Sequence, residues 1–192
     1  MSAFRLNPWH TFFTLLFFAL LYSFANAPEE LAVLLIVAYL LARLTFFPVK
    51  RFFFTKAVAF DMGGVITKGD FYTEELVEME GTRDLVERLK VGHKVALLTN
   101  NNSLAFEPFD RKFGLSQLFD VVIVSGKEGA KKPDEKLFKI ALRKLHVRPH
   151  HLYFLDDAPA NVDAAKRLGI HGIVFKDAKQ AEKALKEAGL TF

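Results

Sequence analysis

The stretch AVAFDMGG, residues 57–64, decides the fold prediction. Its first four residues are apolar and predict a short buried strand. The strand ends at a carboxylate, Asp61, and the glycines at positions 63 and 64 are typical of a turn. An acidic side chain between a buried strand and glycines, which let a ligand approach the backbone closely, indicates the mouth of an active site. The remaining residues have to supply the partners of Asp61.

Short apolar runs alternate with helical patterns through residues 57–192. The predicted strands are 56–61, 94–99, 120–124, 152–155 and 172–175, and the predicted helices are 82–90, 104–113, 134–145, 159–168 and 178–188. A repeated order of strand and then helix predicts the α/β class, here a Rossmann-like three-layer α/β/α parallel sheet. Ligands bind such sheets at the carboxyl ends of the strands.

The first 55 residues have a different composition from the rest of the chain. Residues 7–28 contain no Asp, Glu, Lys or Arg, and Arg43 is the only charged residue in 31–49. Helices of about 20 such residues cross the roughly 30 Å hydrocarbon core of a bilayer. We therefore predict that residues 1–55 form a membrane anchor of two transmembrane helices and that residues 56–192 form a separate α/β domain.

Basic residues predict the orientation of the anchor. Arg5 precedes the first segment, and Lys50, Arg51 and Lys56 follow the second, so both outer ends and the α/β domain are expected on the cytoplasmic side of the membrane. Two alternatives stay open. Residues 25–27, Ala-Asn-Ala after an apolar run, also fit a signal-peptide cleavage site. The two apolar segments also fit a buried helical hairpin of a soluble protein.

Charge and cysteine content narrow the function classes. The net charge is +4, of which +3 lies in residues 1–56, so the α/β domain is nearly neutral. A nearly neutral domain argues against nucleic acid as a partner, because nucleic-acid binding depends on clustered basic residues. The absence of cysteine from the sequence excludes disulfides, thiol catalysis and Cys-ligated metals.

Polar side chains follow three of the predicted strands. Asp61 ends the first strand, Thr99 and Asn100 end the second, and the pair at 156–157, Asp-Asp, ends the fourth. Lys132 lies at the start of the helix before that fourth strand. Because the carboxyl ends of parallel strands meet at one edge of a sheet, we expect these side chains to form one site.

The chemistry of this set suits phosphoryl transfer. Carboxylates from two strands, Asp61 and one of the pair at 156–157, can hold Mg²⁺, which also binds substrate phosphate oxygens. With the metal bound, Asp61 stays ionised and can attack phosphorus. Lys132 would hold a phosphoryl oxygen, and the Thr99 hydroxyl and the backbone N–H groups after it would donate to the others.

Four segments complete the argument, in chain order: FDMGGVI at 60–66, LLTNN at 97–101, KKPD at 131–134 and FLDDAPANVDAAKRLG at 154–169. Together they resemble the four motifs of the haloacid dehalogenase-like (HAD) superfamily. Most members of that superfamily are Mg²⁺-dependent phosphatases that act through an aspartyl-phosphate. The resemblance extends from residue 57 to about residue 176, and the order and spacing of the motifs are suitable throughout.

The resemblance implies a role for each site residue. Asp61 is the expected nucleophile, Thr99 and Asn100 are expected to bind phosphate, and Lys132 corresponds to the lysine of the third motif. The expected metal ligands are Asp61, the backbone carbonyl of Gly63, Asp157 and its acidic companion Asp156. These assignments predict a HAD-like phosphatase that hydrolyses a phosphomonoester.

The sequence departs from the family pattern at Gly63. Family phosphatases usually carry a second Asp there, which protonates the leaving oxygen and later activates water. A positioned acid contributes about 10²- to 10⁴-fold in rate, so we expect reduced or leaving-group-selective activity. Asp70 and Tyr72 are candidate substitutes for the missing acid. Asn161 stands where many relatives have another acidic residue.

A second departure is the absence of room for a cap domain, which many relatives insert to select small substrates. About 30 residues separate residue 65 from 94, and about 30 separate 102 from 132. Open sites in this family serve large substrates or are covered by another subunit, as in a homo-oligomer. Joined to a membrane anchor, an open site predicts a phosphorylated substrate at the bilayer, such as a phospholipid, an isoprenoid phosphate or a membrane protein.

The main rival is a non-catalytic module, which keeps the Mg²⁺ and phosphate site but serves as a membrane-tethered sensor or assembly partner. Gly63 favours this rival, because it removes the acid. The set of Asp61, Lys132 and the acidic pair at 156–157 favours the enzyme.

Three histidines also resemble a metal cluster in the sequence: His146, His150 and His151. They precede the fourth predicted strand, which puts them at the opposite end of the sheet from the site. We therefore predict a surface role for them.

Overall fold

The computed structural model describes residues 56–69 and 75–192. These residues belong to one compact unit that spans Phe52–Phe192. The predicted membrane segments, the predicted domain boundary at residue 55, and the candidate acids Asp70 and Tyr72 lie outside the described residues. Within the two described ranges, no helix combines the length and the apolar composition that crossing a membrane requires.

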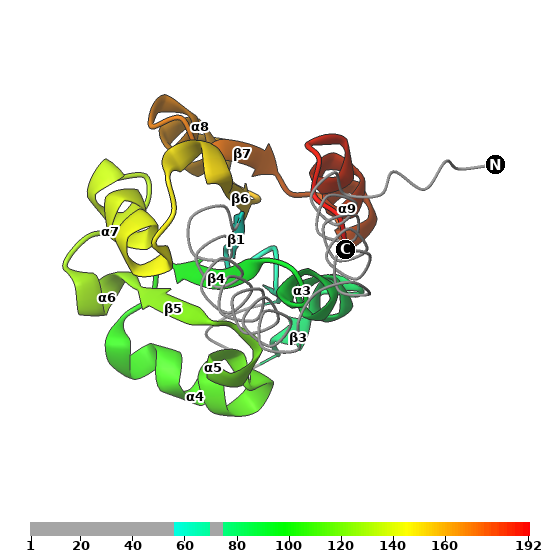
Figure 1. Cartoon of the computed structure of the whole chain (residues 1–192). Coiled ribbons are helices and arrows are strands. Elements are labelled where there is room, and N and C mark those ends of the chain that lie inside the picture. The colour runs from blue at the N-terminus through cyan, green and yellow to red at the C-terminus, as the bar shows by residue number, and fades with distance from the viewer. Residues whose placement is uncertain (1–55, 70–74) are drawn as a thin grey trace, which may run out of the picture. The chain divides into compact units, whose positions relative to one another are not determined.

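A five-stranded parallel sheet forms the centre of this unit (Figure 1). Its strands are β1 (Ala57–Phe60), β4 (Lys94–Thr99), β5 (Val121–Val124), β6 (Leu152–Asp156) and β7 (His171–Val174). Their order is β5-β4-β1-β6-β7, and every neighbouring pair is parallel. The fully buried β1 is the central strand, as its uniformly apolar sequence requires. The predicted α/β class and parallel sheet are confirmed.

Helices cover both faces of the sheet. They are α3 (Thr82–Lys90), α4 (Ser103–Phe113), α7 (Glu135–Leu145), α8 (Pro159–Arg167) and α9 (Ala178–Glu187). One core cluster joins the sheet to α3, α4 and α9, and a second joins it to α7 and α8. In β1, Val58 and Phe60 belong to the first cluster and Ala57 and Ala59 to the second, because successive side chains of a strand point to opposite faces.

Helix starts follow local sequence signals. The side chains of Asn102, Asp134 and Asp177 accept hydrogen bonds from backbone N–H groups in the first turns of α4, α7 and α9. Helix α8 begins with Pro159. Proline suits the first helical position, because an N–H at that position would have no acceptor within the helix. Helices α4 and α8 begin after the carboxyl ends of β4 and β6, so their first turns border the predicted site.

Several short elements were not predicted. Strands β2 (Thr67–Lys68) and β3 (Val77–Glu78) pair antiparallel after the glycine turn. The Met62 carbonyl fixes that turn by accepting hydrogen bonds from the backbone N–H groups of Ile66 and Thr67, both at 2.9 Å. Two four-residue helices, α5 (Leu115–Leu118) and α6 (Ser125–Glu128), and a 3₁₀ turn at Pro149–His151 complete the described elements.

Candidate active site

A buried lysine links the ends of β1 and β6. The Lys132 Nζ atom lies 2.6 Å from Oδ1 of Asp61 and 2.7 Å from Oδ2 of Asp156. The side chain of Lys132 is 1% exposed, that of Asp61 14% and that of Asp156 0%. Burying three charges costs free energy unless they are well paired. The sequence therefore folds three residues from distant segments into one ionic centre, as predicted from the positions of the strand ends.

Hydrogen bonds occupy both oxygens of Asp156. Its Oδ1 accepts from the backbone N–H of Ala158 at 2.9 Å, and the amide Nδ2 of Asn161 lies 3.0 Å from each carboxylate oxygen. Oδ2 also accepts from Lys132 at 2.7 Å. Asp156 therefore orients Lys132, and Asn161 supplies a neutral donor to both of its oxygens. The sequence alone did not reveal this role of Asn161.

Three carboxylates converge around the lysine. Asp61, Asp156 and the exposed Asp157 each offer an oxygen, and these oxygens lie within 4.8 Å of one another. Burial raises the pKa of Asp61 from 3.8 to about 6, with Lys132 lowering it and Asp156 raising it. Burial, followed by the charge of Asp156, also raises the pKa of Asp157. Three acids facing one lysine leave an excess of negative charge, and oxygen donors of this kind fit a hard divalent cation such as Mg²⁺.

The two glycines after Asp61 have different geometry. Gly64 has φ 73°, and a Cβ atom there would lie only 2.2 Å from Oδ2 of Asp157. The turn can pack against that carboxylate only because position 64 has no side chain. Gly63, in contrast, is absent from the positive-φ glycines found in the described part of the chain, so its φ does not require a glycine.

Asn100 is tied to the backbone of Lys132. The Asn100 Nδ2 atom donates to the Lys132 carbonyl at 2.9 Å, and the Lys132 N–H donates to Asn100 Oδ1 at 2.8 Å. The Asn100 side chain thus positions the lysine. The phosphate contact expected of Asn100 stays a prediction. Both polar atoms of the side chain already bind the backbone of Lys132, so the backbone N–H of Asn100 would have to make that contact. Thr99, the residue before Asn100, ends β4 and is buried.

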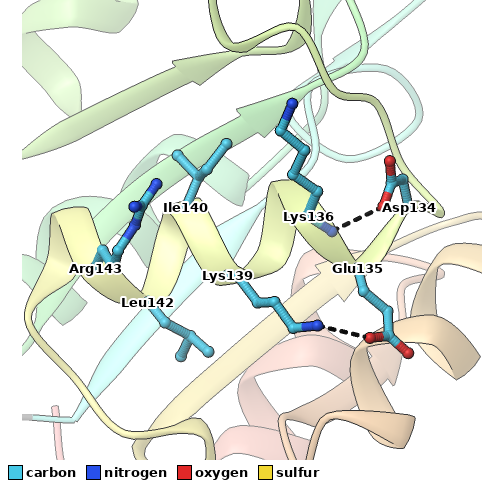
Figure 2. A pocket seen from close by; sticks show the side chains of 7 residues that line it. All are labelled: Asp134, Glu135, Lys136, Lys139, Ile140, Leu142 and Arg143. Carbon is cyan, nitrogen blue, oxygen red and sulfur yellow. Dashed lines mark hydrogen bonds and ion pairs between the residues drawn. The ribbon is translucent and has the colours of Figure 1, made fainter.

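One surface hollow lies beside the predicted site, and another lies on α7. The first, about 620 Å³, borders the site through Asn100. Its lining is Asn100, Asn101, Asn102, Ser125, Gly126, Gly129, Ala130, Lys131 and Asp134. The second, about 900 Å³, lies over the outer surface of α7, where Lys139 pairs with Glu135 at 2.9 Å (Figure 2). None of the predicted site residues lines the second hollow, whereas Asn100 lines the first.

The histidines lie away from this site. His150 and His151 form the 3₁₀ turn before β6, and His146 ends α7, all at the amino end of the sheet. The metal-binding arrangement found among the described residues consists of Asp61, Asp156 and Asp157.

The fold and the site together define a Rossmann-like α/β protein whose carboxylates and lysine converge at the carboxyl ends of the strands. A family model described as haloacid dehalogenase-like hydrolase matches residues 71–169, and the chain belongs to this family. The family predicted from the four sequence motifs is confirmed.

Curated relatives include phosphatases. The chain is 31% identical over 125 residues to a glyceraldehyde 3-phosphate phosphatase of Pyrococcus furiosus, a match that covers 64% of this chain and 52% of the relative. It is 40% identical over 99 residues to acyl-CoA dehydrogenase family member 10 of Mus musculus, a match that covers 50% of this chain and 9% of the relative. The chain thus spans about half of the archaeal phosphatase and a small part of the mouse protein.

Solved structures share the fold. An Asp12Ala mutant of a HAD family enzyme from Bacteroides thetaiotaomicron, in complex with magnesium and inorganic phosphate, matches with a TM-score of 0.58 and 18% identity. The match covers 64% of this chain and 95% of that enzyme. A predicted HAD-like family hydrolase from Porphyromonas gingivalis matches with a TM-score of 0.58 and 19% identity over 69% of this chain and 97% of its own.

Proposed function

We propose that this protein is a Mg²⁺-dependent phosphatase that hydrolyses a phosphomonoester through an aspartyl-phosphate on Asp61. The observation that supports this most directly is the placement of Asp61, whose carboxylate lies 2.6 Å from Lys132 and close to Asp157. The family assignment and the phosphatases among the relatives agree with this class of reaction.

The metal site of the proposal consists of Asp61, the Gly63 carbonyl and Asp157, with Asp156 as their acidic companion. The donor set supports Mg²⁺, since it offers only oxygen atoms and an excess of negative charge. Bound Mg²⁺ would neutralise the carboxylates and the phosphate, and would keep Asp61 ionised at neutral pH. The magnesium and phosphate complex of the Bacteroides enzyme supports the same choice of ion.

The residues of this chain perform two displacements in the proposal. A carboxylate oxygen of Asp61 forms a bond to phosphorus, and the bond from phosphorus to the leaving oxygen breaks. Lys132 balances charge on one phosphoryl oxygen, while the Thr99 hydroxyl and the Asn100 backbone N–H donate to others. Water then attacks phosphorus, and the bond from phosphorus to the Asp61 oxygen breaks. Phosphate leaves with the two protons of the water, and Asp61 is restored as a carboxylate.

Gly63 shapes the substrate range of the proposal. No side chain at that position can protonate the leaving oxygen, so that proton has to come from water or from another group. Acyl and aryl phosphates hardly need the acid, whereas alkyl phosphates depend on it. We therefore propose activity that is selective for good leaving groups.

The surroundings of the site complete the proposal. Between β1 and α3 the described elements are only the β2–β3 hairpin, which supports an open site without a cap. We propose that a large substrate or a second copy of the chain covers it. The apolar segments in residues 7–28 and 31–49 support a membrane anchor with the catalytic domain on the cytoplasmic side, and a phosphorylated substrate that is membrane-associated.

The test is phosphate release by the full chain in detergent, with Mg²⁺ or with EDTA. The substrates are acetyl phosphate, an aryl phosphate and a short-chain phosphatidic acid. We expect release that requires Mg²⁺, is lost in Asp61→Asn, and is retained in Asp163→Asn, which changes an exposed carboxylate of α8. Equal release by wild type and Asp61→Asn would contradict the proposal.

A non-catalytic, membrane-tethered module that binds Mg²⁺ and phosphate is the second candidate, and Gly63 is the observation that favours it. The phosphate-release test, together with a measurement of Mg²⁺ binding, separates the two functions. Mg²⁺ binding by calorimetry, together with no phosphate release from any of the three substrates, would favour the module.

A further inference from the structure

Five cationic or titratable side chains gather at the amino end of the sheet, the edge opposite the active site. We call them the amino-end cluster: Lys56, Arg148, His150, His151 and His171. Lys56 directly precedes β1, the next three lie in and before the 3₁₀ turn that leads into β6, and His171 begins β7. The cluster therefore extends across three neighbouring strands.

Contacts connect four of the five members of the cluster. The rings of His150 and His151 have centroids 4.3 Å apart, and His171 Nε2 lies 3.1 Å from the His150 carbonyl oxygen. His171 also stacks on Tyr153 with ring centroids 4.7 Å apart. Lys56 Nζ lies 5.5 Å from the centroid of the same Tyr153 ring. One tyrosine thus connects the lysine before β1 to the histidine of β7.

Within the described residues, no carboxylate forms an ion pair with a member of the cluster. Burial lowers the pKa of His151 most, and its neighbours His150, Arg148, Lys56 and His171 lower it further. Lys56 Nζ donates to the Ala188 and Gly189 carbonyls and forms no ion pair with a carboxylate of the described residues. Across the described ranges no acidic side chain forms an ion pair with Arg148.

Neighbouring residues extend the positive face. Lys166 and Arg167 are exposed in the last turn of α8, beside the loop that leads to β7, and neither forms an ion pair with a residue in the described part. Val91, after the last turn of α3, presents an apolar side chain that is 87% exposed at the same end of the sheet. Cations together with an exposed apolar side chain fit the headgroup region of a bilayer.

We propose that this amino-end face docks on an anionic membrane surface and that the carboxyl ends of the strands, with Asp61 and Lys132, face the water. The uncompensated positive charge complements anionic lipid headgroups. The direction of the chain agrees, because Lys56 follows the predicted membrane segments and leads straight into β1. The inference rests on the proposed membrane anchor, and it does not depend on phosphatase activity.

The experiment compares two labelled positions at opposite ends of the sheet. The chain contains no cysteine, so Val91→Cys and Leu104→Cys each provide a single labelling site. Leu104 is 79% exposed at the start of α4, after the carboxyl end of β4. The full chain, with a fluorophore at one position, is reconstituted in nanodiscs of phosphatidylcholine, with or without phosphatidylserine, and a quencher is attached to the lipid headgroups.

We expect quenching of the label at position 91 that increases with phosphatidylserine, and little quenching at position 104 in either lipid. High salt should reduce the quenching at position 91, because exposed charges are screened within about 3 Å at 1 M ionic strength. Equal quenching at the two positions, or quenching at 91 that is the same in both lipids, would overturn the proposal.

Charge reversal tests the cluster itself. Arg148→Glu with His150→Glu should abolish the dependence of quenching on phosphatidylserine. Lys179→Glu with Lys183→Glu, which changes exposed residues of α9, should leave that dependence in place. Unchanged quenching in the Arg148/His150 variant would contradict the proposal. If that variant does not fold, the salt titration of the labelled wild-type sequence decides the question.

Discussion

The Nζ atom of Lys132 lies 2.6 Å from Oδ1 of Asp61, and both side chains are largely hidden from solvent. The two partners are not equivalent. The lysine has a second buried partner in Asp156, at 2.7 Å, whereas removal of the lysine leaves two carboxylates without a cation. Substitution of the acid and substitution of the base should therefore change stability in opposite directions.

Asp61→Asn should stabilise the metal-free protein at neutral pH. The pKa of Asp61 is about 6 in the folded protein and 3.8 ordinarily, so between these values the folded state binds more protons than the unfolded state. The wild-type protein in EDTA should then lose stability as the pH rises from about 4 to about 6. Above that range the variant should be more stable by up to about 3 kcal/mol, measured by urea unfolding at pH 4 and pH 7.5. A variant less stable than wild type at pH 7.5 would refute this.

Lys132→Met should destabilise the protein by about 3 to 5 kcal/mol, because breaking a buried ion pair leaves unpaired charge behind. Phosphate release should also disappear. Lys127→Met is the matched control, since Lys127 is exposed, lines neither hollow and should tolerate the change. Urea unfolding and phosphate release of the two variants are compared, and similar losses in both would rule out a special role for Lys132.

Gly64→Ala should weaken Mg²⁺ binding through Asp157. The new Cβ atom would lie 2.2 Å from Oδ2 of Asp157, so the carboxylate has to move. Gly129→Ala is the control, because Gly129 has φ 60° and a Cβ atom added there would meet nothing within 4 Å, which leaves only the backbone strain. By titration calorimetry we expect an affinity at least about tenfold lower for the first variant. Equal affinities would show that Asp157 does not bind the metal.

Asn161→Asp should make folding depend on Mg²⁺. The substitution removes the amide that donates to both oxygens of Asp156 and places a like charge beside them. We expect a loss of about 1 to 3 kcal/mol in EDTA, recovered in part when Mg²⁺ is added. Asn161→Ala removes the donor without adding charge. Mg²⁺ should therefore stabilise this variant no more than it stabilises the wild-type protein. Urea unfolding with and without Mg²⁺ provides the measurement.

Gly63→Asp should restore the missing acid. Position 63 is not among the positive-φ glycines of the described residues, so the φ there does not oppose an aspartate and the variant is expected to fold. Hydrolysis of an alkyl phosphate should increase by about 10²- to 10⁴-fold, while hydrolysis of acetyl phosphate should change little. No gain on the alkyl phosphate would mean that another group already supplies the proton, and Asp70 and Tyr72 are the residues to substitute next.

Sequence periodicity predicted the long elements well. The predicted helix at 82–90 coincides with α3, and the predicted strand at 94–99 coincides with β4, because each has an apolar pattern long enough to identify. The β2–β3 hairpin has two residues in each strand, too few to show a period, and the backbone of the glycine turn determines its course. The four-residue helices α5 and α6 were missed for the same reason.

The convergence of the site was also predictable, because Asp61, Thr99 and Asp156 lie at the ends of parallel strands. The finer contacts were not. Asn100 holds the backbone of Lys132, and Gly64 makes room for Asp157, through contacts between segments far apart in the chain. Such contacts depend on side-chain rotamers and on the exact approach of two backbones, neither of which leaves a pattern in the sequence.

The central position of β1 has a consequence for biosynthesis. Ala57 pairs with Lys94 on one side and with Leu152 on the other, so the second neighbour of β1 leaves the ribosome much later than β1 itself. A nascent chain that has been made only as far as Lys132 contains Asp61 but has neither Asp156 nor Asp157 to complete the ionic centre. Premature termination before β6 therefore yields a fragment with an unpaired strand edge and only one of the three clustered carboxylates, and we expect such a fragment to aggregate.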